Sequence, residues 1–180
     1  VFEAPDHPGE LPDRSAGGRL RRGAVKFMLR ETGTLWPDPA SLRERVRQAH
    51  LQGRQVAIHA IEQPAVSAAV EAIEAALEEQ TRPDHRHRIE HAGVVPGDLR
   101  RRMARAGIAV VTQPAFLLHS GDRYLETVAP EALADLYPVG RLHQEGVTVA
   151  FSSDAPVVPP SPVQAVRAAV ERRTELGRTV

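Results

Sequence analysis

Short runs of apolar, mostly β-branched residues recur along the chain, and a glycine precedes four of them. Such runs are typical of buried strands, and the glycines suit the left-handed residue that closes a helix or loop. The pattern predicts strands at 24–29, 54–59, 108–113 and 147–152, and a more polar fifth strand at 87–91.

Helical spacing fills the intervals between these runs. The predicted helices begin near Asp38, Gln63, Pro96, Pro130 and Ser161, where N-capping side chains or first-turn prolines stand. Strands that alternate with helices imply a parallel sheet, in either a doubly wound fold or a (β/α)8 barrel. A complete barrel needs at least about 200 residues. About five βα units in 180 residues therefore predict a smaller doubly wound domain or a partial barrel.

The composition argues against several classes of function. The net charge is zero and no aromatic platform accompanies the basic clusters, so nucleic acid is not an expected partner. No run approaches the roughly 18 apolar residues of a membrane span, and no signal peptide is visible, so a cytoplasmic location is expected. Because the chain has no cysteine, His, Asp, Glu or a modified lysine would have to hold any metal.

Three potential metal ligands stand at the ends of predicted strands: His59, His91 and Asp154. In both α/β architectures, ligands meet the carboxyl ends of the strands. We therefore expect these three side chains to lie together. Alternation along the last strand places Asp154 on the face of the small residues, opposite Val149 and Phe151, which in a barrel are expected to face the helices.

Lys26 is the only lysine among 23 cationic residues, and alternation directs it, with Met28, away from Phe27 and into a barrel interior. A buried ammonium needs a partner or must be neutralised. Two alternatives are open. Carbamylation would turn the amine into a carboxylate that bridges two metal ions, whereas an ion pair with an acid such as Glu90 would retain the charge.

Other polar residues carry weaker signals. Gln113 ends the strand at 108–113, where it could orient a substrate or a ligand. His119 is expected in the loop after that strand, on the surface or in contact with substrate. His85 and His87 flank a strand entrance, the end opposite to catalysis in such folds.

Taken in order, six short motifs resemble the amidohydrolase superfamily, in its branch of predicted metal-dependent hydrolases with a TIM-barrel fold. The resemblance implies that residues 23–180 form the C-terminal part of the barrel, strands four to eight. Residues 1–22 are rich in Gly, Pro and charge, which indicates a loop or the tail of a preceding unit. The motifs are Val-Lys-Phe at 25–27, His-Ala-Ile at 59–61, Arg-Ile-Glu-His-Ala at 88–92, Thr-Gln-Pro at 112–114, Gly-Asp-Arg-Tyr at 121–124 and Ser-Asp-Ala-Pro at 153–156.

The resemblance also implies roles for the candidate residues. Lys26 corresponds to the metal-bridging, often carbamylated lysine, and His59 and His91 to ligands on the fifth and sixth strands. Asp154 corresponds to the aspartate that binds metal and shuttles the proton. The implied activity is hydrolysis of a C–N bond, in an amide or cyclic amide of a small molecule. One or two divalent ions, with zinc the first expectation, would lower the pKa of bound water to about 7.

The chain departs from the family pattern in two places. The family's first-strand His-x-His pair is absent, because nothing upstream of Lys26 supplies it. After His59 the family commonly continues Gly-Asp, whereas Glu62-Gln63-Pro64 follow here. The alternative function is therefore a non-catalytic fragment that serves as a scaffold or oligomerisation unit. A partial barrel has open strand edges, so we expect a homo-oligomer unless an N-terminal segment completes it.

Overall fold

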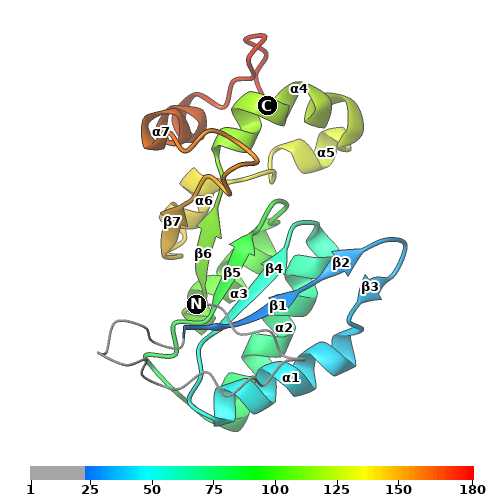
Figure 1. The fold of residues 1–180 in the computed structure, drawn as a ribbon, viewed down its shortest axis with the longest axis vertical. Coiled ribbons are helices and arrows are strands. Elements are labelled where there is room, and N and C mark those ends of the chain that lie inside the picture. The colour runs from blue at the N-terminus through cyan, green and yellow to red at the C-terminus, as the bar shows by residue number, and fades with distance from the viewer. Residues whose placement is uncertain (1–22) are drawn as a thin grey trace.

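Five parallel strands form the sheet predicted from the apolar runs. The computed structural model describes residues 23–180, so the predicted tail at 1–22 lies outside the described residues. The strands pair in chain order, β1-β4-β5-β6-β7 (Figure 1). They are β1 (Val25–Met28), β4 (Val56–Ala60), β5 (Arg88–His91), β6 (Ala109–Thr112) and β7 (Val149–Phe151).

The strand order distinguishes the two predicted architectures. A doubly wound sheet reverses its strand order at a switch point, whereas a barrel wall adds strands in one direction. No reversal occurs between β1 and β7. The sheet is therefore part of a (β/α)8 barrel, and the prediction of about five βα units is confirmed.

The helices begin where capping residues predicted them. The Asp38 carboxylate accepts hydrogen bonds from the backbone N–H groups of Ala40 and Ser41, both at 3.1 Å, and the Ser161 hydroxyl accepts from Gln164 N–H at 3.4 Å. Every helix within residues 23–180 is too short or too polar to cross a bilayer. The helices are α1 (Pro39–Leu51), α2 (Gln63–Glu79), α3 (Gly97–Ala106), α4 (Ala115–Thr127), α5 (Pro130–Leu133), α6 (Val139–Gln144) and α7 (Pro162–Glu171).

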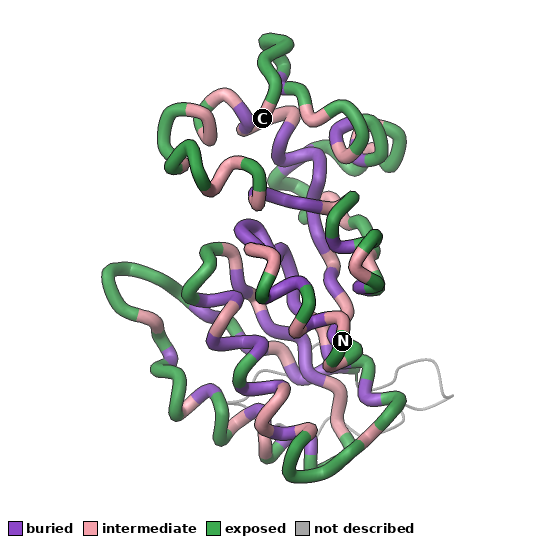
Figure 2. Tube along the Cα trace, turned by 180° about the vertical axis from the view of Figure 1, so that it is seen from behind, coloured by how far each residue is buried: buried purple, intermediate pink, exposed green. Residues whose placement is uncertain are grey.

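One face of the sheet forms the main core. The strand register aligns Phe27, Ile58, Ile89 and Val110 in a row, and each of these side chains is 0–2% exposed. Figure 2 shows that buried residues gather along the central strands. The adjacent register row, Met28, His59 and Glu90, points to the opposite face because side chains alternate along a strand. Met28 there is 42% exposed. This second face is the one that a closed barrel would turn inward.

Three parts of the structure differ from the sequence prediction. A small antiparallel hairpin, β2 (Arg30–Glu31) with β3 (Leu35–Trp36), follows β1 and was not predicted. The expected loop after β6 is the helix α4, so the placement of His119 in a loop is wrong. Phe151 is 40% exposed instead of packed under helices, because it lies in β7 at the open edge of the sheet.

Gly121 lies inside α4, which the sequence pattern does not predict. An isolated glycine within a helical pattern disfavours a helix. In the structure, a Cβ at this position would lie 2.7 Å from Thr174 Cγ2. The glycine therefore permits close packing of α4 against the C-terminal turn. The helix is stabilised by this tertiary contact, which the local sequence does not reveal.

Three buried histidines form a hydrogen-bonded chain at the amino ends of the strands. Val56 N–H donates to His87 Nδ1 at 3.1 Å, so this nitrogen carries no proton. His87 Nε2 must then donate to His50 Nδ1 at 2.8 Å, and His50 Nε2 to the carbonyl of Gln80 at 2.7 Å. His85 is linked in the same way, because its Nδ1 accepts from His87 N–H at 2.8 Å. All three imidazoles are therefore neutral.

We predict that the buried histidines make the protein less stable in mild acid. Burial, followed by the neighbouring His85, lowers the pKa of His87 to about 3. An unfolded histidine takes up a proton near pH 6.5, so between about pH 6.5 and 3 the unfolded state binds the extra proton. The free energy of unfolding should therefore decrease with falling pH by about 1.4 kcal/mol per unit for this residue.

Urea unfolding between pH 4.5 and 7 measures this slope. His87→Asn should reduce the slope by about one proton, although it also lowers stability at pH 7. His143→Asn, on the exposed side of α6, is the matched control and should leave the slope unchanged. An unaltered slope in His87→Asn would contradict the assignment.

Gly93 allows the loops after β4 and β5 to touch. A Cβ on Gly93 would lie 2.9 Å from both the carbonyl oxygen and Cγ2 of Ile61, and the former is backbone that cannot rotate away. Val94 N–H donates to the same Ile61 carbonyl at 2.9 Å. The close approach therefore keeps these two loops in register.

Gly93→Ala should destabilise the protein by about 1–3 kcal/mol, since overpacking forces the backbone to shift. Gly140→Ala is the control, because nothing lies within 4 Å of a Cβ at Gly140 in α6. Alanine there should be neutral or stabilising. Thermal unfolding of both variants tests the prediction, and equal stability would refute it.

Candidate metal centre and active site

Two predicted ligands meet where β4 and β5 end. His59 lies within β4 and His91 closes β5, on adjacent parallel strands. Their ring centroids are 4.3 Å apart, with the planes at 73°. The sequence prediction that these two histidines lie together is confirmed.

Both imidazoles are neutral near pH 7. Burial, then the neighbouring His91 and Lys26, lowers the pKa of His59 to about 4. Burial also lowers the pKa of His91. A histidine binds metal only when it is deprotonated, so both rings are in the form that a metal requires.

Gln113 orients His91. The distance from His91 Nδ1 to Gln113 Oε1 is 2.7 Å, and an amide oxygen can only accept, so Nδ1 carries the proton. Gln113 Nε2 in turn donates to Ser152 Oγ at 3.3 Å, which fixes the orientation of the amide. The Nε2 lone pair of His91 is thereby left for a ligand. Metal-binding histidines in proteins are commonly held in this way.

Backbone strain falls on two of the three predicted ligands. His91 has φ 72° and Asp154 has φ 54°, and Ala92 between the strand and its loop has φ 49°. Residues other than glycine seldom adopt this left-handed conformation, which costs on the order of 1–3 kcal/mol and clusters at functional sites. No sequence pattern predicted these positive φ angles, because they depend on the contacts of the folded loops.

Lys26 pairs with an acid on the second face of the sheet, which the helices leave uncovered. Its Nζ lies 3.8 Å from Glu90 Oε1, and the same oxygen accepts from Arg88 Nε at 2.8 Å. The ion pair that the sequence offered as one alternative is thus present. Burial is the main cause that lowers the pKa of Lys26.

The described residues supply some, but not all, of the ligands that a metal ion needs. His59 and His91 supply two neutral nitrogens, and the negative charge of Asp154 only partly offsets the lowering of their pKa values by burial. Asp154 is itself exposed after β7. Within residues 23–180, no group of three or more His, Asp or Glu side chains is arranged to hold a metal. The two histidines are therefore candidate ligands for a centre that would need further donors.

His119 contacts a different part of the structure. Its Nδ1 lies 2.7 Å from Glu175 Oε1, so its hydrogen bond joins α4 to the C-terminal turn. A substrate contact for His119 stays a prediction. Gln113, by contrast, joins the metal-ligand candidates directly through His91.

Comparison with known proteins extends these observations. A profile of the Amidohydrolase family matches residues 6–179. The chain is 30% identical over 137 residues to YtcJ of Bacillus subtilis (strain 168), a protein assigned to the amidohydrolases, covering 76% of this chain and 25% of YtcJ. It is also 30% identical over 126 residues to the N-substituted formamide deformylase of Arthrobacter pascens, covering 69% of this chain and 23% of that enzyme.

A solved structure shows the same fold. An uncharacterised metal-dependent hydrolase of Pyrococcus horikoshii OT3 superposes with a TM-score of 0.76 at 26% identity, over 95% of this chain and 38% of that protein. Among the curated relatives, YtcJ and the formamide deformylase, the chain spans about a quarter of each protein's length. With a family match along almost its whole length and a parallel half-barrel that superposes on a metal-dependent hydrolase, the chain belongs to the amidohydrolase family.

Proposed function

We propose that the whole protein is a metal-dependent hydrolase that cleaves a C–N bond in an amide or cyclic amide. The observation that carries this proposal is the pair of adjacent, neutral imidazoles of His59 and His91, the second oriented by Gln113. The name of the Arthrobacter pascens relative, a formamide deformylase, supports the choice of bond. In the reaction, water adds across the C–N bond, with hydroxyl on the acyl carbon and a proton on the leaving nitrogen.

In this proposal His59, His91 and Asp154 hold a divalent ion, and Lys26 joins them if it is carbamylated. Nitrogen and carboxylate ligands suit zinc. The ion, when bound, makes hydroxide available near neutral pH. The Asp154 carboxylate accepts the proton from the attacking water and passes it to the leaving nitrogen. Donors from outside residues 23–180 complete the centre.

Metal content tests the ligand assignment. The whole protein should bind a transition metal near stoichiometrically, and His59→Ala or His91→Ala should lose it. Gln113→Ala should weaken metal affinity about 10–100-fold, because partners behind a ligand set its orientation. Gln52→Ala, an exposed residue after α1, is the matched control. Unchanged affinity in both histidine variants would rule out the assignment.

Turnover tests the role of Asp154. Asp154→Asn keeps the side-chain shape but cannot accept the proton, so kcat/KM for an amide substrate should fall about 10²–10⁴-fold. Its unfolding temperature should stay near that of the wild type. Asp98→Asn, exposed in the first turn of α3, should leave turnover intact. Near-normal turnover in Asp154→Asn would refute the proposed proton transfer by Asp154.

A further inference from the structure

A cleft opens immediately beyond the two histidine-bearing strands. Ile61 lies two residues after His59 and Val94 three residues after His91, and both line the cleft. Its volume is about 690 Å³, within the range of about 300–1,000 Å³ that is usual for small-molecule sites. The opposite wall comes from α4, α5 and the residues that follow α5, which Figure 1 shows beyond the carboxyl ends of the strands.

The buried part of the wall is apolar and aromatic. Val94, Leu136 and Tyr137 are 3–6% exposed and line the cleft together with half-buried Ile61 and Tyr124. The charged residues of the lining are all exposed, which places them at the rim: Glu31, Glu62 and Arg123. A cavity with apolar depth and a polar rim suits an uncharged, bulky group.

Tyr137 gives this wall a fixed shape. Its backbone has φ 42°, a strained value for tyrosine. Its N–H donates to the Gly93 carbonyl at 2.7 Å, and its carbonyl accepts from Arg172 at 3.1 Å. Its ring packs edge-on against Phe116, with centroids 6.0 Å apart.

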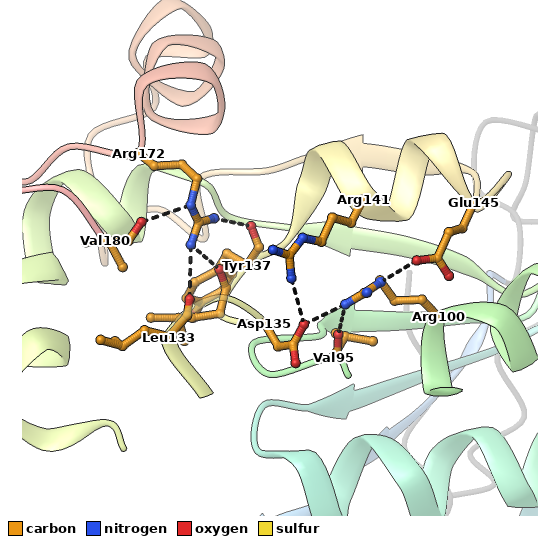
Figure 3. Close-up of polar contacts among 10 residues, drawn as sticks. Val95, Arg100, Leu133, Asp135, Tyr137, Arg141, Glu145, Arg172 and Val180 are labelled. Carbon is orange, nitrogen blue, oxygen red and sulfur yellow. Dashed lines mark hydrogen bonds and ion pairs between the residues drawn. The ribbon is translucent and has the colours of Figure 1, made fainter. Parts of the chain in front are cut away.

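Arg172 donates hydrogen bonds to the segment that contains Tyr137. Figure 3 shows its guanidinium surrounded by backbone carbonyls and not by carboxylates. Besides Tyr137, it donates to the carbonyls of Leu133 and Leu136 at 3.2 and 3.0 Å, and to that of Val180 at 3.1 Å. The end of α5 and the Tyr137 backbone are thereby held together. A wall anchored at this many points is preorganised for a ligand.

From this geometry we infer that the cleft is the specificity pocket for an aromatic or branched aliphatic substituent on the nitrogen or acyl side of the scissile bond. This inference rests on the proposed amide hydrolysis, since Ile61 and Val94 of the lining follow the strands that carry His59 and His91. The walls select for size and apolar character, and the charged side chains of the lining lie at the rim.

Binding of a fluorinated probe tests the pocket without turnover. N-(4-fluorobenzyl)formamide is titrated into metal-free whole protein and followed by ¹⁹F NMR, with N-methylformamide as the small competitor. The benzyl compound should bind at least about 10-fold more tightly, which is the effect of burying one phenyl ring. Equal affinity for the two compounds would overturn the inference.

Two variants fill the cleft from its opposing wall, and one leaves it open. Ala132→Trp on α5 and Thr127→Trp at the end of α4 both place an indole in the cleft, and Thr127 is exposed, so the fold should tolerate it. Each should weaken benzyl binding about 10-fold or more. Ala134→Trp, exposed just after α5 and outside the lining, is the matched control and should bind normally. Normal binding in both filling variants would also overturn the inference.

Turnover by the metal-loaded protein separates the two proposals. If the benzyl probe binds with the expected discrimination but no formamide or other amide is hydrolysed, the specificity pocket is supported and the proposed amide hydrolysis is refuted. If both formamides are hydrolysed with equal kcat/KM and Ala132→Trp changes neither value, amide hydrolysis is supported and the specificity pocket is refuted.

Discussion

The backbone segment Gly93–Val95 is the support on which both the candidate centre and the cleft depend. On one side, Val94 N–H bonds to the carbonyl of Ile61 and ties the exit of β5 to the exit of β4. On the other side, Gly93 accepts from Tyr137 N–H, and Val95 N–H donates to the carbonyl of Asp135. One short stretch thus links the ends of the two histidine-bearing strands and holds the segment that walls the cleft. A buried arginine strengthens it, since Arg100 donates to the Val95 carbonyl and to Asp135, each at 2.7 Å (Figure 3).

The uncovered face of the sheet carries charge where a separate domain would carry apolar side chains. Glu90 is only 8% exposed, and the positive charges of Arg88 and Lys26 compensate the burial of its carboxylate. Such a face suits a barrel interior, in which charged side chains pair with one another. The exposed apolar residues of α7, Val163 at 78% and Val170 at 77%, lie beyond the edge strand β7. Both features agree with a chain that spans 38% of a structurally similar hydrolase.

The sequence predicts those parts of the fold that depend on local patterns. Alternating β-branched runs give the strands, and Asp38 and Ser161 give helix starts, since capping is a local interaction. The placement of His59 and His91 at one edge follows from strand direction alone. The helix α4 could not be predicted, because Gly121 is favourable only once Thr174 packs against it.

Protonation and strain at the site also depend on contacts between distant segments. Gln113 lies 22 residues from His91, and their hydrogen bond fixes which imidazole nitrogen is free. The buried histidine chain is similar, because Val56 and His87 are 31 residues apart. The cleft is set by four separate segments of the chain, and no sequence pattern indicated it.

X-ray absorption at the zinc edge of the zinc-loaded whole protein tests most directly whether His59 and His91 bind one metal centre. We expect imidazole scattering from at least two histidines in the wild type, and fewer imidazoles when either His59 or His91 is replaced. Zinc bound with an unchanged imidazole count in both variants would contradict it.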